Sequence, residues 1–107
     1  MSFDALLAAL QATPRDIDRE LRDGRIFSVE LAGQLYYPAF FADSNIDRAA
    51  LGSVSIALGG MPGWTKFDFL VSRRESLGER SALEALAAGA VALVLNCAQR
   101  FRAGEAG

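Results

Sequence analysis

The sequence predicts a mainly α-helical protein with one β-hairpin, in which a short N-terminal helix-turn-helix and a hairpin wing precede a small C-terminal helical bundle. Two observations predict this fold class. Apolar residues recur every three or four positions through most of the 107 residues, as in amphipathic helices. In residues 26–37 they alternate, as in strands. We expect the helix-turn-helix and hairpin in residues 1–42 and the helical bundle in residues 43–107, and both regions can belong to one compact unit.

Two short helices are expected first. Residues 3–11 place four apolar side chains at helical spacing: Phe3, Leu6, Leu7 and Leu10. In the next segment Thr13 is suited to cap a helix and Pro14 to occupy its first position. Gly24 is expected to end that helix in the left-handed conformation. Two helices joined by so short a turn have the size of a helix-turn-helix.

A β-hairpin is expected over residues 26–37, with about five residues on each side. Gly33 can adopt the positive φ that a tight hairpin turn requires. Pro38 ends the second strand because it has no N–H to donate. A hairpin directly after two helices is the layout of a winged helix.

A third helix is expected to begin at a cap formed by Ser44 or Asn45 and to end at Gly59 and Gly60. Its buried face consists of Ile46, Ala50, Leu51, Val54 and Leu58. We interpret "LGGMPGW" as a turn between helices, because it lacks the Gly and Lys spacing of a P-loop. The helix after this turn is expected to direct four side chains largely inward: Trp64, Phe67, Phe69 and Leu70.

The stretch "SLGERSALEALAAG", residues 76–89, predicts a tight loop that opens into a short capped helix. Leu77 and Gly78 indicate a turn with an apolar anchor. Ser81 and Glu84 have the spacing of a capping box, and the Gly at position 89 ends the helix. A final helix follows, with an apolar face formed by Val91, Val94, Leu95, Ala98 and either Phe101 or Arg102. It is expected to fray into the polar tail "AGEAG".

Composition argues against several classes of function. The chain has no histidine, which removes the commonest general base and the commonest metal ligand. Its single cysteine, Cys97, lies in an apolar run and is expected in the core, not in a disulfide or metal cluster. We therefore expect no enzymatic activity, cofactor or metal. No apolar run is long enough to span a bilayer and no signal-peptide pattern is present, so a cytoplasmic protein without membrane contact is expected.

Four arginines follow one another at intervals of three or four residues through the second helix: Arg15, Arg19, Arg22 and Arg25. Such a stripe is typical of a recognition helix that contacts DNA. Four carboxylates occupy the same segment, Asp16, Asp18, Glu20 and Asp23, and the net charge of the chain is −2. The alternative is therefore a solvated, salt-bridged helix that serves folding or dimerisation.

From about residue 14 to residue 102, the order of these features resembles the antitoxins of the Xre/MbcA/ParS type. The resemblance is most specific over residues 62–95. It is carried by an aromatic lead, Trp64 and Phe67, and by a frame of the toxin-binding domain: Leu77, Gly78, Arg80, Leu83, Glu84, Leu86 and Gly89. Tyr37 and Pro38 match the Tyr-Pro-containing hairpin of variants with a compact helix-turn-helix.

Three positions of the frame depart from the family pattern, and the segment "TPN" that precedes it in the family is replaced by "VSR". Glu79 replaces a Gly, Ser81 replaces a Thr, and Ala82 replaces a Pro. Ser81 retains the capping chemistry, and Ala82 loses a rigid first helical position without preventing the helix. Glu79 adds a side chain at the turn, which changes either the turn geometry or the contact made there.

The resemblance implies a non-enzymatic antitoxin whose last two helices and tail bind and occlude a cognate toxin, a RES-domain or related enzyme that acts on NAD. The implied toxin-binding residues are Trp64, Leu77, Gly78, Arg80, Leu83, Leu86, Arg100 and Arg102. The leucines and Phe101 are either core residues or apolar anchors, and Trp64 is either a core residue or part of an interface. The N-terminal part is expected to bind operator DNA weakly, or only as a homodimer. The alternative function is a stand-alone winged-helix-like transcriptional regulator.

Overall fold

The structure is a computed structural model that describes residues 1–104. Helices dominate, and the hairpin β1–β2 is one of two small antiparallel sheets, so the predicted fold class is confirmed. The second sheet, β3–β4, is not predicted by the sequence. In chain order the elements are α1 (Phe3–Leu10), α2 (Pro14–Arg22), β1 (Val29–Leu31), β2 (Gln34–Tyr36), the 3₁₀-helix η1 (Ala39–Ala42), α3 (Arg48–Ala57), α4 (Gly63–Val71), β3 (Arg73–Arg74), the 3₁₀-helix η2 (Glu75–Leu77), β4 (Arg80–Ser81), α5 (Ala82–Ala87) and α6 (Val91–Arg102).

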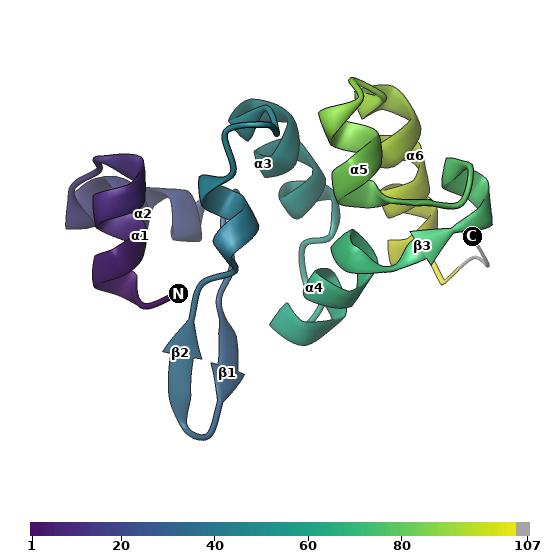
Figure 1. Ribbon diagram of the computed structural model, residues 1–107. Helices are drawn as coiled ribbons and strands as arrows, with labels where there is room; N and C mark the ends of the chain where they lie inside the picture. Colours follow the sequence, from purple (N-terminus) through teal and green to yellow (C-terminus); the bar gives the residue numbers. More distant parts are fainter. Residues whose placement is uncertain (105–107) are drawn as a thin grey trace.

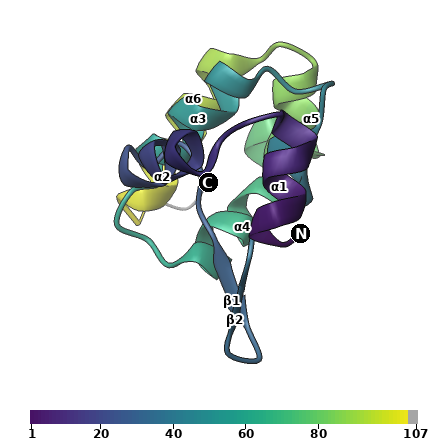
Figure 2. The ribbon, with the colours of Figure 1, turned by 90° about the vertical axis from the view of Figure 1, so that its left-hand side faces the viewer.

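The helices lie in two groups on either side of α3 (Figure 1). One end of the molecule is formed by α1 and α2, and the other by α5 and α6. Helix α3 packs against α6, and α4 packs against both β1 and α5. The hairpin projects from the body, and its tip is clear of the helices in two perpendicular views (Figures 1 and 2).

Helix α2 begins and ends where its capping residues predict. The Thr13 hydroxyl accepts the N–H of Asp16, and the Asp16 carboxylate accepts the N–H of Thr13, both at 3.2 Å. Gly24 has a φ of +78°, which ends α2 in the left-handed conformation as expected. These local signals need no tertiary contact to operate, which is why the sequence predicts them well.

The hairpin is shorter than predicted, with three residues on each side instead of about five. Ala32 and Gly33 form its two-residue turn with φ values of +53° and +80°, so the role expected of Gly33 is confirmed. The strand cannot extend back to position 26, because Ile26 and Phe27 are both buried and consecutive strand residues face opposite sides. At the other end, Tyr37 pairs with Met1 instead of with β1.

The cap of α3 also differs from the prediction. Asp47 forms it, with its carboxylate accepting the N–H of Ala50 at 3.1 Å, so the expectation of Ser44 or Asn45 is wrong. Residues 43–46 instead form a separate turn, in which the Asp43 carboxylate accepts the N–H of Asn45. The predicted buried face of α3 is confirmed, since all five of its apolar residues lie in the core: Ile46, Ala50, Leu51, Val54 and Leu58.

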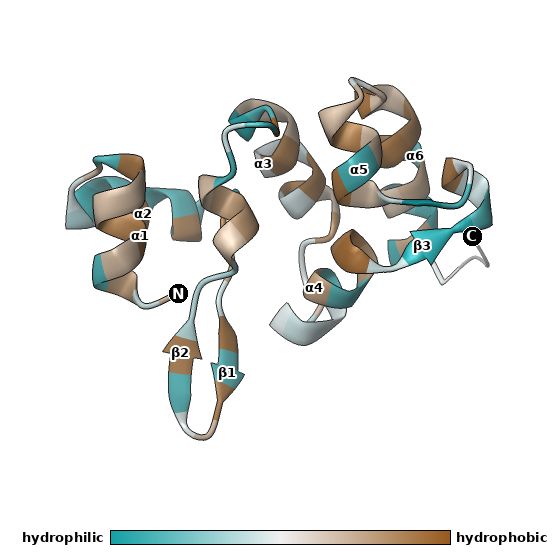
Figure 3. Cartoon of the chain, in the orientation of Figure 1, coloured by the Kyte–Doolittle hydropathy of each residue, from teal (hydrophilic) through white to brown (hydrophobic). Residues whose placement is uncertain are grey.

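Buried apolar side chains from Leu6 to Ala98 form one cluster that crosses the expected boundary after residue 42. Hydrophobic residues are accordingly distributed over the helices at both ends of the molecule (Figure 3). The buried hydroxyl of Ser55 in α3 donates to Gly24 O at 2.6 Å and ties α3 to the end of α2. Among the described helices, none is long and apolar enough to cross a membrane.

Candidate partner-binding surface

A tight loop between β3 and α5 carries the first three frame residues of the antitoxin resemblance, Leu77, Gly78 and Arg80. Leu77 is completely buried beneath it, whereas Gly78 and Glu79 are exposed at its tip. Both tip residues have positive φ, 72° and 63°. A residue with a side chain pays about 1–2 kcal/mol for this conformation, so Glu79 is a strained position that its surroundings must hold. Glu79 thus adopts a backbone conformation that glycine favours.

Several hydrogen bonds hold this loop. The N–H of Glu79 donates to Arg74 O at 2.9 Å, and Arg80 Nε donates to Leu77 O at the same distance. The Ser81 hydroxyl accepts the N–H of Glu84 at 3.1 Å, and Glu84 Oε1 accepts the N–H of Ser81 at 3.0 Å. The predicted capping box is thus confirmed, and the loop has a fixed shape.

The same contacts set the charge of Glu84. The hydrogen bond from the Ser81 backbone, followed by that from its side chain and by the charges of Arg73 and Arg80, lowers the pKa of the Glu84 carboxyl from 4.5. Glu84 is therefore ionised at neutral pH and engaged at the start of α5.

Of the implied toxin-binding residues in the loop and α5, some are buried in the core and others are accessible at the surface. Leu77 and Leu86 are 0% and 3% exposed, so both belong to the core that supports the loop and α5. Gly78 is exposed, while Arg80 and Leu83 are half-buried. The surface of this region is therefore formed by the loop tip and by the sides of Arg80 and Leu83.

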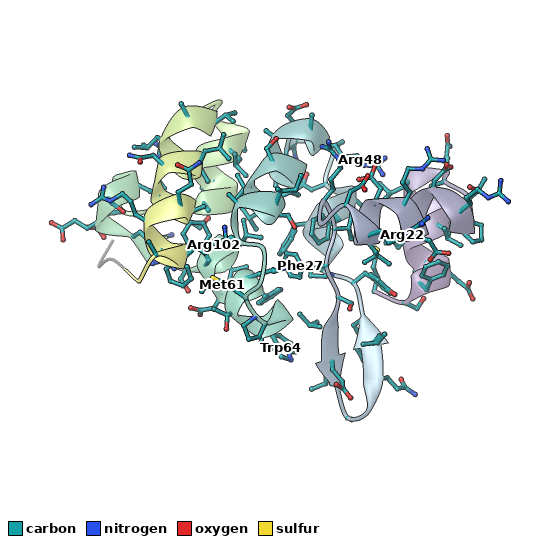
Figure 4. The ribbon with its side chains drawn as sticks, turned by 180° about the vertical axis from the view of Figure 1, so that it is seen from behind. Arg22, Phe27, Arg48, Met61, Trp64 and Arg102 are labelled. Carbon is teal, nitrogen blue, oxygen red and sulfur yellow. The ribbon has the colours of Figure 1, made fainter. Side chains whose placement is uncertain are left out.

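Helix α6 packs against η2, at the start of the same loop (Figure 1). Ser76 in η2 contacts α6 through its hydroxyl, which lies 3.4 Å from the sulfur of Cys97. Cys97 is buried, as predicted. Arg100 and Arg102 are exposed on the final turn. Both arginines lie on the helix that packs against η2, and Figure 4 shows Arg102 beside Met61, just before the start of α4. The last three residues of the predicted tail lie outside the described residues.

No motif in the sequence marks Arg74, which the structure places next to this surface. Its guanidinium carbon lies 4.5 Å from the ring centre of Phe69 and 4.7 Å from that of Phe101, so cation–π contacts connect β3 to α4 and α6. In the β3–β4 ladder it stands directly opposite Arg80. Its buried Nε has no hydrogen-bond partner among residues 1–104. The sequence feature that could have indicated this contact is the pair of adjacent arginines, Arg73 and Arg74, because one of two consecutive strand residues faces the interior.

Trp64 does not belong to this surface. It lies at the opposite end of α4, beside the hairpin (Figure 4). Its indole is 47% exposed, so the prediction that it points inward is wrong. Its Nε1 donates to Glu30 O at 2.8 Å, and its ring meets the edge of Phe67. The reason is chemical, since an indole N–H needs an acceptor and the strand edge supplies one.

The arginines of the second helix do not form one stripe. Arg15, Arg19 and Arg22 are exposed on α2, whereas Arg25 lies beyond its end. The stem of Arg25 covers Gly52 of α3, with its Cβ and Cγ within 3.5 Å of the position that a side chain there would take. With about 3.6 residues per turn, the three helical arginines share the face opposite the buried Ile17.

Carboxylates flank this arginine face on both sides. Asp16 and Glu20 lie on one side and Asp18 on the other. Hydrogen bonds from the Thr13 backbone and hydroxyl are the main causes that lower the pKa of the Asp16 carboxyl from 3.8. These negative charges oppose the approach of a phosphate backbone.

A shallow groove of about 370 Å³ separates α2 from α3. Its walls are Glu20, Arg25, Arg48 and Ala49. The carboxylate of Glu20 and the guanidinium of Arg48 approach to 4.0 Å within it (Figure 4 labels Arg48). Opposite charges therefore meet inside the groove, where Glu20 neutralises part of the positive charge of Arg25 and Arg48.

Within the described part of the chain, no group of three His, Cys, Asp or Glu side chains is placed to hold a metal ion. The observations that bear on function are the loop held by hydrogen bonds, the exposed arginines of α6 and the exposed face of α2. No protein-family model matches the chain, and no match was found among curated proteins or among solved structures.

Proposed function

We propose that this chain is a non-enzymatic, antitoxin-like protein whose C-terminal surface binds and occludes a cognate toxin. The observation that carries the proposal is the exposed loop tip, Gly78 and Glu79, which hydrogen bonds hold and which follows the contact of η2 with α6. A rigid loop loses little conformational entropy when a partner binds, which makes it suited to recognition. The class of toxin, a RES-type or related enzyme that acts on NAD, follows from the resemblance of the frame.

Charge also supports a protein partner at this surface. Residues 73–102 contain five arginines and three glutamates, an excess of two positive charges in a chain of net charge −2. The remaining residues therefore carry four net negative charges. Complementary charge increases the rate and specificity of association, so we expect the toxin to present an acidic rim to Arg100 and Arg102.

Co-expression with the product of the adjacent gene tests the proposal. We expect the wild-type chain to restore growth and to form a complex that survives pull-down. Arg102→Glu should weaken the complex at least about tenfold, because it reverses an exposed charge that the resemblance assigns to toxin binding. Arg22→Glu is the matched control on α2 and should leave the affinity unchanged. If the wild-type chain neither restores growth nor forms a complex, the proposal is wrong.

The second candidate function is a stand-alone winged-helix-like transcriptional regulator. The exposed face formed by Arg15, Arg19 and Arg22 favours it, because this face points away from the core. Such a regulator should shift a promoter fragment with steep salt dependence, and Arg15→Glu or Arg19→Glu should abolish the shift. A shift that persists in both variants would contradict DNA binding through α2.

A further inference from the structure

The hairpin β1–β2 has two edges, and the rest of the chain covers them unequally. The edge of β1 is occupied by Trp64, whose Nε1 donates to Glu30 O. At the base of β2, Tyr37 exchanges two backbone hydrogen bonds of 2.7 Å with Met1, which therefore pairs with this edge like a one-residue strand. Beyond Tyr37, towards the tip, the edge of β2 is clear of the other described elements (Figures 1 and 2).

Leu35 lies on this open edge. Inward- and outward-directed peptide groups alternate along a strand, and those of Tyr37 point outward to Met1. The N–H and C=O of Leu35, two residues earlier, therefore also point away from β1. The register of the hairpin leads to the same orientation. A two-residue turn makes Leu31 and Gln34 a hydrogen-bonded pair, so the next residue, Leu35, makes no backbone hydrogen bond to β1.

The open edge lacks the features that usually prevent pairing with another chain. Edge strands are commonly protected by lysine, proline, a bulge or a covering segment. Residues 34–36 are Gln, Leu and Tyr, and their register with β1 is continuous. The Leu35 side chain is 58% exposed. A projecting two-stranded hairpin is itself only marginally stable, so an added strand would stabilise it.

We propose that two copies of this chain associate through their β2 edges, about a two-fold axis at Leu35. In antiparallel register, Leu35 of each copy lies opposite Leu35 of the other, and Gln34 lies opposite Tyr36. Across the two-fold axis an apolar side chain therefore meets an apolar one, and a polar side chain meets a polar one. The Tyr36 hydroxyl donates to Gln34 Oε1 at 3.0 Å within one strand, which leaves the Gln34 amide N–H groups to donate to the Tyr36 hydroxyl of the second copy.

The same geometry limits the assembly to two copies. Pairing of the β2 edges produces a four-stranded sheet whose outer strands are the two β1 strands. Trp64 occupies the edge of each β1, so a third copy finds no equivalent edge. An isologous contact of this kind closes on itself.

A second copy fits this edge better than a nucleic acid does. The only charged residue of β1 and β2 is Glu30, which is negative. Phosphate contacts require lysine or arginine, and the hairpin strands have neither. Strand pairing needs only the backbone and the uncharged side chains that the edge presents.

Sedimentation equilibrium of the purified chain, from about 10 µM to about 1 mM, tests this inference without any toxin. We expect the average mass to rise from that of the 11.5 kDa monomer towards twice that value, with a Kd inside this range because the shared edge is short. Leu35→Lys places two positive charges together at the axis and should raise the Kd at least about tenfold.

Leu31→Lys is the matched control. Leu31 is also 58% exposed and lies in the same hairpin, but on the strand whose edge Trp64 occupies, so the Kd should change less than about threefold. As a second readout, exchange of the Leu35 amide should slow as protein concentration rises, while that of Glu30 should not. A wild-type chain that stays monomeric, equal weakening by both lysine variants, or a dimer insensitive to Leu35→Lys would each overturn the inference.

Discussion

The cap of α5 allows a quantitative test of the loop architecture. Replacing Ser81 by Ala removes the hydroxyl that accepts the N–H of Glu84. Loss of an N-cap costs about 1 kcal/mol on average. Ser81 is only 6% exposed, so water replaces the lost acceptor poorly and the penalty for an unsatisfied donor adds to this value. We expect Ser81→Ala to lower the free energy of unfolding by about 1.5–2 kcal/mol.

Thr13→Ala provides the matched comparison. Thr13 and Asp16 form the same reciprocal box at the start of α2, but both residues are exposed. Water can hydrate the freed N–H, so a loss of about 0.5–1 kcal/mol is expected. Urea unfolding followed by circular dichroism measures both, with unchanged m values. A loss for Thr13→Ala equal to or larger than that for Ser81→Ala would refute the argument from burial.

Three further predictions concern single side chains. Trp64→Phe keeps an aromatic ring but removes the N–H that donates to Glu30 O. It should lower the free energy of unfolding by about 0.5–1 kcal/mol and speed amide exchange in the hairpin. Unchanged amide exchange would contradict this prediction. Because the pKa of Glu84 is lowered on folding, its ionised form contributes stability above pH 4.5 that is lost as the pH falls through the folded pKa, so Glu84→Gln should flatten the acid part of a stability–pH curve. Arg74→Gln should cost about 1 kcal/mol through its two phenyl contacts, whereas Arg73→Gln should change thermal unfolding by less than about 0.5 kcal/mol.

Local signals in the sequence predict much of the fold. The boxes at Thr13 and Ser81 and the left-handed Gly24 depend on residues within one turn of each other, so spacing alone reveals them. The capping residue of α3, in contrast, cannot be chosen from spacing alone. Three neighbouring residues could cap it, and the turn formed by residues 43–46 decides in favour of Asp47.

Long-range contacts account for what the sequence does not predict. The hairpin shortens because Ile26 and Phe27 are both drawn into the core, and Trp64 turns outward because its N–H finds an acceptor 34 residues away. The candidate surface likewise has one part that the sequence predicts and one part that depends on long-range contacts. Its loop is evident from the spacing of the frame, but the position of Arg74 over two rings depends on how α4, β3 and α6 meet.

Amide hydrogen exchange of the chain, alone and in complex with the product of the adjacent gene, locates the toxin-binding face. We expect slower exchange in the loop and α5, residues 77–87, and in the last turn of α6, with no change in β1 or β2. Protection confined to α2 or the hairpin, or no protection at all, would contradict the assignment of the C-terminal surface as the toxin-binding face.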